Sequence, residues 1–300
     1  MLFSCVMVPQ YREAMGELPV RVTFYGTRGS TPCSGENLQR YGGQTSCVVI
    51  EHAGTPVILD VGTGLRRYGC QLRDDGVTGF GATVLLTHTH WDHVQGLPFF
   101  APLLDPTTQL DVYGPGDCGR PFPELIPDLM RPPYFPVTPE QLPATIRFHD
   151  LRDDDLGLDD VKIRARNVPH TDYTNGYRVE LHGVSIAFVP DHQEPLDRPD
   201  HVDERVLELC DGVDLLIHDA QYTPEQLAQR PDWGHCTVDY ALTVAKQCGA
   251  ARLAMFHHDP WHDDDTIDTF AADAAASVAD NPGVEVFAAA AGQSLGLGIA

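Results

Sequence analysis

The sequence predicts an α/β fold built as one large domain. Short apolar segments of strand type alternate with helix-type segments, an order typical of layered α/β proteins. In both halves, charged residues stand just past the apolar segments, where loops converge on active sites in such folds. Hydrophobic residues make up 42% of the 300 residues, and no low-complexity linker divides them. We therefore expect one domain over residues 20–300, preceded by an N-terminal tail over residues 1–19.

In the first half, strands alternate with loops and lead to a histidine-rich segment. The expected strands cover residues 20–25, 47–50, 57–59 and 82–86. The first shows polar and apolar alternation, the third ends before Asp60, and the fourth is largely apolar. A helix is expected to begin near Asp92 and to continue through Phe100. Residues 101–147 contain many prolines, so we expect them to be irregular and to cap part of the molecule.

In the second half, helices follow several of the strands. The expected strands cover residues 161–166, 177–181, 184–189, 213–218, 252–256 and 284–289. Helices are expected over residues 203–210, 237–248 and 264–279. Thr237 is a suitable N-cap for the second helix and Gly249 a suitable end.

The composition favours a cytoplasmic protein. The formal net charge of −23 opposes broad binding of nucleic acid, although it also has a simple interpretation as a solubilising surface. No apolar run approaches the roughly 20 residues that span a bilayer. The apolar start is short and lacks the basic region of an export signal, and Met15 would be a sensible alternative start. We therefore expect the eight cysteines, none in a C-x-x-C pair, to be reduced thiols.

The strongest chemical signal is the run His88-Thr89-His90-Trp91-Asp92-His93. It offers four imidazole or carboxylate ligands directly after an apolar strand, and these groups suit zinc and similar divalent ions. His88 and His90 can point to one side of a turn, while Asp92 and His93 point to a second ion beside the first. The alternative is a polar loop with incidental histidines.

Two ions need more ligands, and other strand ends supply candidates. His170 follows the strand at 161–166, Asp191 follows VSIAFVP, and His257 follows RLAMF. A carboxylate has two oxygens, so Asp191 could bridge both ions. Each of these residues also has a simpler interpretation as a capping or solvated side chain.

These motifs together resemble the metallo-β-lactamase superfamily. The matching segments are GTRGSTP, YGGQTSC, LDVGTG, HTHWDH, VPHTDYTNGYR, FVPDHQ and FHHDP, spread over about residues 20–290. The resemblance is greatest to the phosphodiesterase-like branch, which includes ribonuclease Z and cyclic phosphodiesterases. It implies a four-layer αβ/βα sandwich, and a homodimer is compatible with it.

The resemblance also implies a ligand set of two metal ions. One ion would take His88, His90 and His170, and the other would take Asp92, His93 and His257. Asp191 would bridge them, and Asp92 would also belong to the catalytic residues. His258 competes with His257, but the family's ligand follows the strand directly. Zinc is expected, with manganese or iron as alternatives.

Three further residues gain roles from the resemblance. Asp60 looks like an acid that holds a ligand loop by hydrogen bonds, although an aspartate before glycine is also common in turns. The segments HDAQY at 218–222 and HCT at 235–237 resemble paired ribonuclease Z motifs. His235 would protonate the leaving oxygen and Asp219 would orient it. Cys236 replaces the usual serine, and His235 could also be a helix neighbour without a catalytic duty.

The implied activity is hydrolysis of a phosphodiester by a hydroxide shared between the ions. A small cyclic or nucleotide-like diester is the expected substrate, because no long basic arm for tRNA is visible and the net charge opposes RNA. The alternatives are a tRNA 3′-processing endonuclease, a hydrolase of esters, thioesters or lactones, and a non-catalytic metal-stabilised scaffold. Arg28 could contact a phosphate, and Tyr134 and Phe135 could close over a base, or they could be ordinary packing residues.

Overall fold

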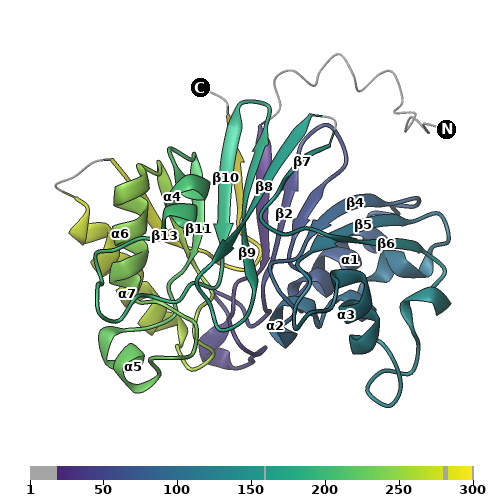
Figure 1. The fold of residues 1–300 in the computed structure, drawn as a ribbon, viewed down its shortest axis with the longest axis horizontal. Helices are drawn as coiled ribbons and strands as arrows, with labels where there is room; N and C mark the ends of the chain where they lie inside the picture. Colours follow the sequence, from purple (N-terminus) through teal and green to yellow (C-terminus); the bar gives the residue numbers. More distant parts are fainter. Residues whose placement is uncertain (1–18, 159, 280–282, 299–300) are drawn as a thin grey trace.

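Two seven-stranded mixed sheets face one another in the computed structural model, which describes residues 19–158, 160–279 and 283–298. Helices cover the outer face of each sheet (Figure 1). The expected N-terminal tail lies, apart from residue 19, outside the described residues, and so does Met15. The resulting order of layers, helix–sheet–sheet–helix, confirms the predicted α/β sandwich.

The first sheet comes from the N-terminal half and the last strand. Its order is β14 (Ser294–Leu297), β1 (Val20–Gly26), β2 (Cys47–Glu51), β3 (Val57–Leu59), β4 (Gly81–Leu85), β5 (Gln109–Gly114) and β6 (Thr145–Asp150). The strands from β3 to β6 are parallel, and the remaining neighbours are antiparallel. The chain thus returns at its end to pair Val20 with Leu297.

The second sheet comes from the C-terminal half. Its order is β13 (Glu285–Ala288), β12 (Arg252–Phe256), β11 (Leu215–Asp219), β10 (Val184–Val189), β9 (Thr174–Leu181), β8 (Val161–Val168) and β7 (Asp155–Leu158). The strands from β10 to β13 are parallel, so their carboxyl ends meet at one edge.

Helices form the outer layers. They are α1 (Gly64–Asp74), α2 (Trp91–Val94), α3 (Phe122–Leu129), α4 (Glu204–Cys210), α5 (Pro224–Gln229), α6 (Val238–Cys248) and α7 (Asp264–Ser277). Figure 1 shows α4, α6 and α7 on one flank and α1 and α3 on the other. The 3-10 turns η3 (Glu36–Leu38), η4 (Leu97–Phe99), η5 (Ala101–Leu104) and η6 (Pro139–Gln141) complete the described elements.

Three buried clusters hold the layers together. One lies between the sheets and includes Phe24 and Leu59 from the first sheet and Phe188 and Phe256 from the second. The other two join each sheet to its own helices. Burying apolar surface on both faces explains the continuously apolar strands, because each parallel strand is covered twice.

The sequence prediction was wrong between residues 92 and 147. The helix expected through Phe100 ends at Val94, because Gly96 approaches Gly62 so closely that a Cβ there would lie 1.9 Å from the Gly62 carbonyl oxygen. The segment expected to be irregular contains β5, α3 and β6. Proline is tolerated at the first turn of α3, so proline content alone does not exclude structure.

Helix α1 was also missed, as were α5 and the strands β7 and β14. In α1 the buried residues Leu65, Tyr68 and Leu72 recur at helical spacing and pack on the first sheet. Among the described residues, no helix has the length and apolar character needed to cross a membrane.

Candidate metal centre

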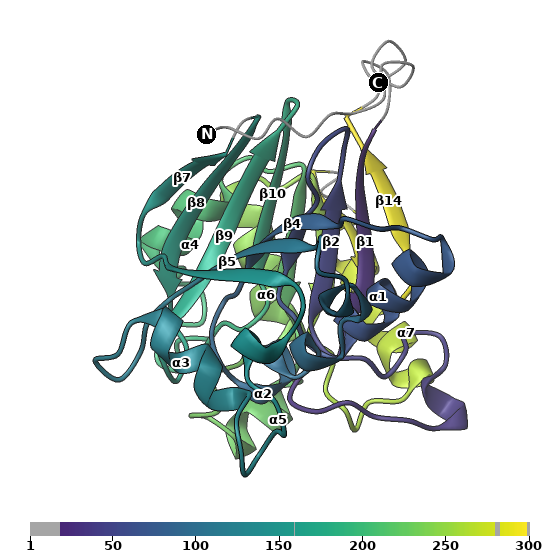
Figure 2. The same ribbon diagram turned by 90° about the vertical axis from the view of Figure 1, so that its right-hand side faces the viewer.

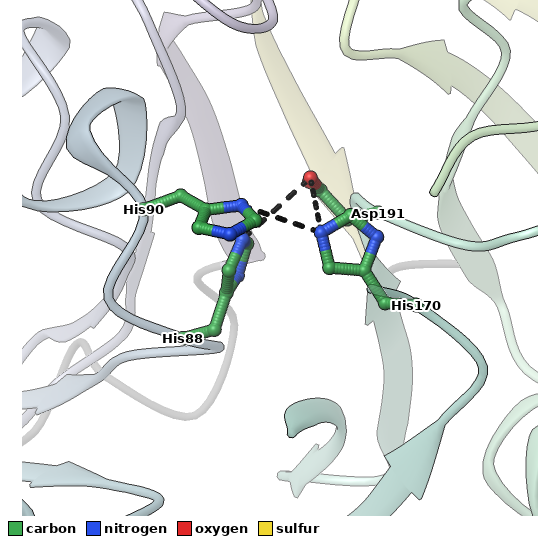
Figure 3. A group of neighbouring side chains, drawn as sticks. All are labelled: His88, His90, His170 and Asp191. Atoms are coloured by element: carbon green, nitrogen blue, oxygen red, sulfur yellow. Dashed lines mark hydrogen bonds and ion pairs between the residues drawn. The ribbon is translucent and has the colours of Figure 1, made fainter. Parts of the chain in front are cut away.

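Histidines and aspartates from both halves of the chain converge where the two sheets meet. One group that could hold a metal ion comprises His88, His90, His170 and Asp191, and a second comprises Asp92, His93 and His257. Figure 3 shows His88 and His90 on one side, facing His170 and Asp191 on the other. In the two ribbon views, α2 and α5 lie toward the same end of the molecule (Figures 1 and 2). The structure thus brings together all seven side chains that the sequence and the resemblance singled out as ligands.

The two oxygens of Asp191 divide between the groups. Oδ2 lies 3.7 Å from Nε2 of His88 and 3.6 Å from Nε2 of His170. Oδ1 lies 3.2 Å from Nε2 of His93 and 3.2 Å from Nε2 of His257. Asp191 directly follows strand β10 and Pro190, which places its carboxylate between the two groups.

The local fold of the histidine run explains how it serves both groups. Strand β4 ends at Leu85, and the backbone stays extended at His90 before helix α2 begins. His88 and His90 therefore lie on the turn, whereas Asp92 and His93 lie in the helix. Nε2 of His93 is 3.2 Å from Oδ2 of Asp92.

The donor atoms fit divalent metal ions. Two ligands of one tetrahedral zinc ion lie roughly 3.3 Å apart, given metal–nitrogen distances of about 2.0–2.1 Å. Nδ1 of His90 is 3.4 Å from Nε2 of His170, and Nε2 of His257 is 3.1 Å from Oδ2 of Asp92. Three buried polar atoms of the centre have no hydrogen-bond partner: Nε2 of His88, Nε2 of His93 and Oδ1 of Asp191. Buried polar atoms are almost always paired, so these three fit the role of metal ligands.

Burial and charge prepare the imidazoles for this role. Burial lowers the pKa of His88 well below its ordinary value and lowers the pKa of His170 to about 4. These rings are therefore neutral, which is the form that binds metal. Burial also disfavours a charged His93, but the carboxylates of Asp92 and Asp191 outweigh burial and raise the pKa of His93 well above its ordinary value. The second group thus demands positive charge, which a divalent ion can supply.

Four of the five imidazoles are fixed through Nδ1, which leaves Nε2 free for the centre. Nδ1 of His93 donates to Asp60 at 2.7 Å, and Nδ1 of His170 donates to the Gly234 carbonyl at 2.7 Å. Nδ1 of His88 lies 3.0 Å from the Thr87 hydroxyl. His90 is the exception, because its Nε2 contacts Asp172 and its Nδ1 faces the group.

Asp60 organises the loop that carries His93. Its carboxylate accepts hydrogen bonds from the Ser46 hydroxyl at 2.8 Å and from the Thr87 amide at 2.9 Å. The backbone of Asp60 has φ of 57°, a left-handed conformation that is uncommon for residues other than glycine. Such strain is concentrated at functional sites. In this conformation the carboxylate reaches both Thr87 and His93.

His257 also has a left-handed backbone, with φ of 59°. Its Nδ1 donates to Oε1 of Gln221 at 2.7 Å, whereas Nε2 of neighbouring His258 donates to the Ala289 carbonyl, away from the centre. Gly29 packs against His257 and Gln221, and a Cβ at position 29 would lie 2.4 Å from the His257 ring. The next residue, Ser30, donates its amide to Asp92 at 2.7 Å.

Gln221 was missed by the sequence prediction, although it stands in the segment HDAQY. The only signal was its position two residues after Asp219, at the end of a strand. Thr87, Ser46 and Gly234 were missed for the same reason, because their partners are distant in sequence or belong to the backbone.

His235 lies beside the second group. It can join Asp191 and His257 in a set of three donor atoms within 4.8 Å of one another. Its Nδ1 donates to Oδ2 of Asp219 at 2.9 Å. The Cys236 thiol donates to the Asp219 carbonyl, and burial raises its pKa well above the ordinary value. The thiol is therefore a protonated structural donor.

The three residues suggested as substrate contacts have different surroundings. Arg28 is fully buried, and its guanidinium donates to the carbonyls of Gly42, Asp259 and His262. The alternative of a packing residue fits Arg28 better than contact with a phosphate, because its side chain has no exposed surface. Its Nη2 is buried without a hydrogen-bond partner. Tyr134 is 78% exposed and Phe135 packs edge-on against Phe99 at 5.8 Å.

A family model described as "Beta-lactamase superfamily domain" matches residues 66–258, more than half of the chain. The chain belongs to the metallo-β-lactamase superfamily. It is therefore a metal-dependent hydrolase with the fold that the sequence motifs implied. The family implies a divalent metal, and the His and Asp groups described above are the candidate site.

Individual relatives lie in the same branch. The chain is 26% identical to the ribonuclease Z of Natronomonas pharaonis over 290 residues, which cover 80% of this chain and 87% of that protein. Its fold is similar to that of a metallo-beta-lactamase fold protein from Bacillus subtilis, with a TM-score of 0.68, 18% identity and coverage of 93% and 99%. The short form of human tRNase Z gives a TM-score of 0.67, 22% identity and coverage of 93% and 100%. The two structural likenesses concern the fold alone.

Proposed function

We propose that this protein is a dinuclear metal-dependent phosphodiesterase. The observation that carries the proposal is the division of the Asp191 oxygens between two groups of ligands. His88, His90 and His170 would hold one ion, and Asp92, His93 and His257 would hold the other. Two bound ions would activate water for attack and neutralise charge on the phosphoryl oxygens. Zinc is the first choice, and the ligands also suit manganese or iron.

His235 supplies the acid that phosphoester chemistry needs. A departing alkoxide is a poor leaving group unless it is protonated, and His235 lies within 4.8 Å of the donor atoms of Asp191 and His257. Asp219 accepts the Nδ1 proton, so the doubly protonated form of His235 would carry the proton to be transferred on Nε2. A thioester expels a thiolate, which needs no such acid, so this residue favours a substrate with an alkoxide leaving group, such as a phosphodiester.

An RNA 3′ end is the first substrate to test. The relative from Natronomonas pharaonis is named ribonuclease Z, and so is a relative from Halobacterium salinarum that is 27% identical to this chain. Their similarity extends over 80% of this chain and supports 3′ processing over the small diester that the sequence favoured. The same similarity weakens the expectation that this protein does not bind nucleic acid.

A small cyclic or nucleotide-like diester is the second candidate. The formal net charge of −23 favours it, because a polyanion gains little from counterion release on an acidic protein. A small diester carries only one negative charge, so the same repulsion costs it far less.

A substrate panel separates the two candidates. Metal-reconstituted protein would be assayed with precursor tRNA, with 2′,3′- and 3′,5′-cyclic nucleotides, with bis(p-nitrophenyl) phosphate and with a lactone. Asp92→Ala serves as the inactive control. Cleavage of the tRNA alone would support RNA processing, and turnover of cyclic nucleotides alone would support the small diester. Turnover of only the lactone would overturn phosphodiester chemistry.

A further inference from the structure

All three tryptophans of the chain are exposed, and each adjoins a segment of the metal centre. Trp91 is 62% exposed between His90 and Asp92, Trp233 is 61% exposed, and Trp261 is 84% exposed. Tryptophan is normally among the more deeply covered residues, because its large ring gains most from burial. Exposed tryptophans beside an active site therefore suggest contact with a ligand.

The segments that carry Trp233 and Trp261 are joined through the ion pair between Arg230 and Asp259. The Arg230 guanidinium lies over the Trp233 ring, 5.3 Å from its centroid, and over the Tyr222 ring at 5.5 Å. Arg230 is also paired with buried Asp259 at 3.0 Å, and the other oxygen of Asp259 accepts the amide of Trp261 at 2.9 Å. These contacts hold the Arg230 guanidinium between the segment that carries Trp233 and the segment that carries Trp261.

This assembly lies next to the proposed catalytic acid. Trp233 is separated from His235 only by Gly234, whose carbonyl accepts the Nδ1 proton of His170. A Cβ at Gly234 would lie 2.3 Å from the His170 ring, so the segment passes directly against the centre. On the other side, the Tyr222 ring meets His235 edge-on at 5.5 Å.

We propose that Trp233, held by Arg230, is a stacking platform for a nucleobase of the substrate. This inference rests on the proposed phosphodiesterase function and specifies its substrate as one that carries a base. The phosphate would sit at the metal centre, and the base would lie over the exposed indole beside His235.

Charge supports a base as the occupant. Asp259 already balances the Arg230 cation, so the assembly is not built to attract a phosphate. On a chain of net charge −23, affinity for a nucleotide must come largely from contacts that do not depend on charge. Stacking on aromatic rings, with arginine contributing a cation–π contact, provides such affinity and accepts any base.

Equilibrium binding tests the platform without relying on turnover. The affinity of metal-loaded protein for adenosine 5′-monophosphate and for ribose 5-phosphate would be measured by calorimetry. The two probes share the phosphate and sugar, and ribose 5-phosphate carries a hydroxyl where the nucleotide carries its base. Wild-type protein should bind the nucleotide about 5-fold or more tightly than the sugar phosphate. Trp233→Ala should remove most of this preference and leave ribose 5-phosphate binding unchanged, whereas Trp233→Phe should keep it. Leu104→Ala, at a site that is 72% exposed in the other half of the chain, is the matched control.

Three results would overturn the platform. They are equal affinity of wild-type protein for the two probes, an equal loss of both in Trp233→Ala, or a change of oligomeric state in Trp233→Ala with the base preference intact. The last result, measured by sedimentation velocity, would assign the surface to a second copy of the chain. Failure of wild-type protein to hydrolyse any phosphodiester of the substrate panel would instead overturn the proposed function, and the binding comparison would still be readable.

Discussion

Asp219 accepts a hydrogen bond from Nδ1 of His235 at 2.9 Å. The carboxylate is itself held by the backbone amides of Gln221 and His192, so its orientation is fixed before a substrate arrives. This contact fixes the orientation of the His235 ring, as the proposed role of an acid requires.

Replacing His235 by alanine should leave both metal ions bound and slow hydrolysis of diesters with poor alkoxide leaving groups by roughly 100-fold or more. The rate with p-nitrophenolate, which departs without a proton, should change little. Steady-state rates on a methyl ester and on a p-nitrophenyl ester, together with metal analysis, provide the comparison. An equal loss on both substrates would show that His235 does not act as the acid.

Asp191→Ala should lose both ions and the activity together, because each of its oxygens serves a different group of ligands. Metal content measured by inductively coupled plasma mass spectrometry, alongside the hydrolysis rate, checks this. Asp273→Ala, on the exposed face of α7, is the control. Full metal content and an unchanged rate in Asp191→Ala would remove this residue from the centre.

Gln221→Ala should weaken binding of the second ion by about 10- to 100-fold, because it frees His257 to rotate. Competition with a chromophoric chelator gives the two affinities separately. The first ion should be affected much less, and Gln247→Ala, an exposed glutamine on α6, should affect neither. If both ions keep wild-type affinity in Gln221→Ala, then Gln221 is only a packing residue.

The free energy of unfolding should decrease as the pH is lowered below about 6.5. Burial lowers the pKa of His262 below its ordinary value of 6.5, Arg28 adds to this effect and Asp259 opposes it. As the pH falls, the unfolded chain takes up this proton before the folded chain does, so folding loses up to about 1.4 kcal/mol per pH unit in that window. The free energy of unfolding, measured with urea at pH 7, 6 and 5, should therefore decrease less steeply in His262→Gln than in the wild type. Identical slopes would exclude a contribution from His262.

The sequence allowed the convergence of the ligand side chains to be predicted because the necessary signals are local. Asp191 and His257 follow the apolar strands β10 and β12, and the carboxyl ends of parallel strands in one sheet meet at one edge. His170 follows β8, which alternates charged and apolar residues and pairs antiparallel with β9. Asp60 could be placed by the same reasoning. Its hydrogen bonds to Ser46 and Thr87 appear only in the structure.

The contacts that the sequence did not reveal depend on the path of the chain in space. Gln221 binds a histidine 36 positions away, and no local pattern marks an amide for that role. Helix α1 was missed although Leu65, Tyr68 and Leu72 recur at helical spacing, because Gly64 and Gly69, which have low helix propensity, lie within it. Strand β5 lies in a proline-rich region, where tertiary pairing with β4 and β6 decides the conformation.

The most direct test of a dinuclear phosphodiesterase is a metal titration of the stripped protein. Hydrolysis of bis(p-nitrophenyl) phosphate would be followed while zinc or manganese is added in known equivalents per chain. We predict no hydrolysis without metal and a rate that rises to a plateau at about two equivalents. A plateau at one equivalent would contradict the shared role of Asp191, and hydrolysis that ignores added metal would contradict the account as a whole.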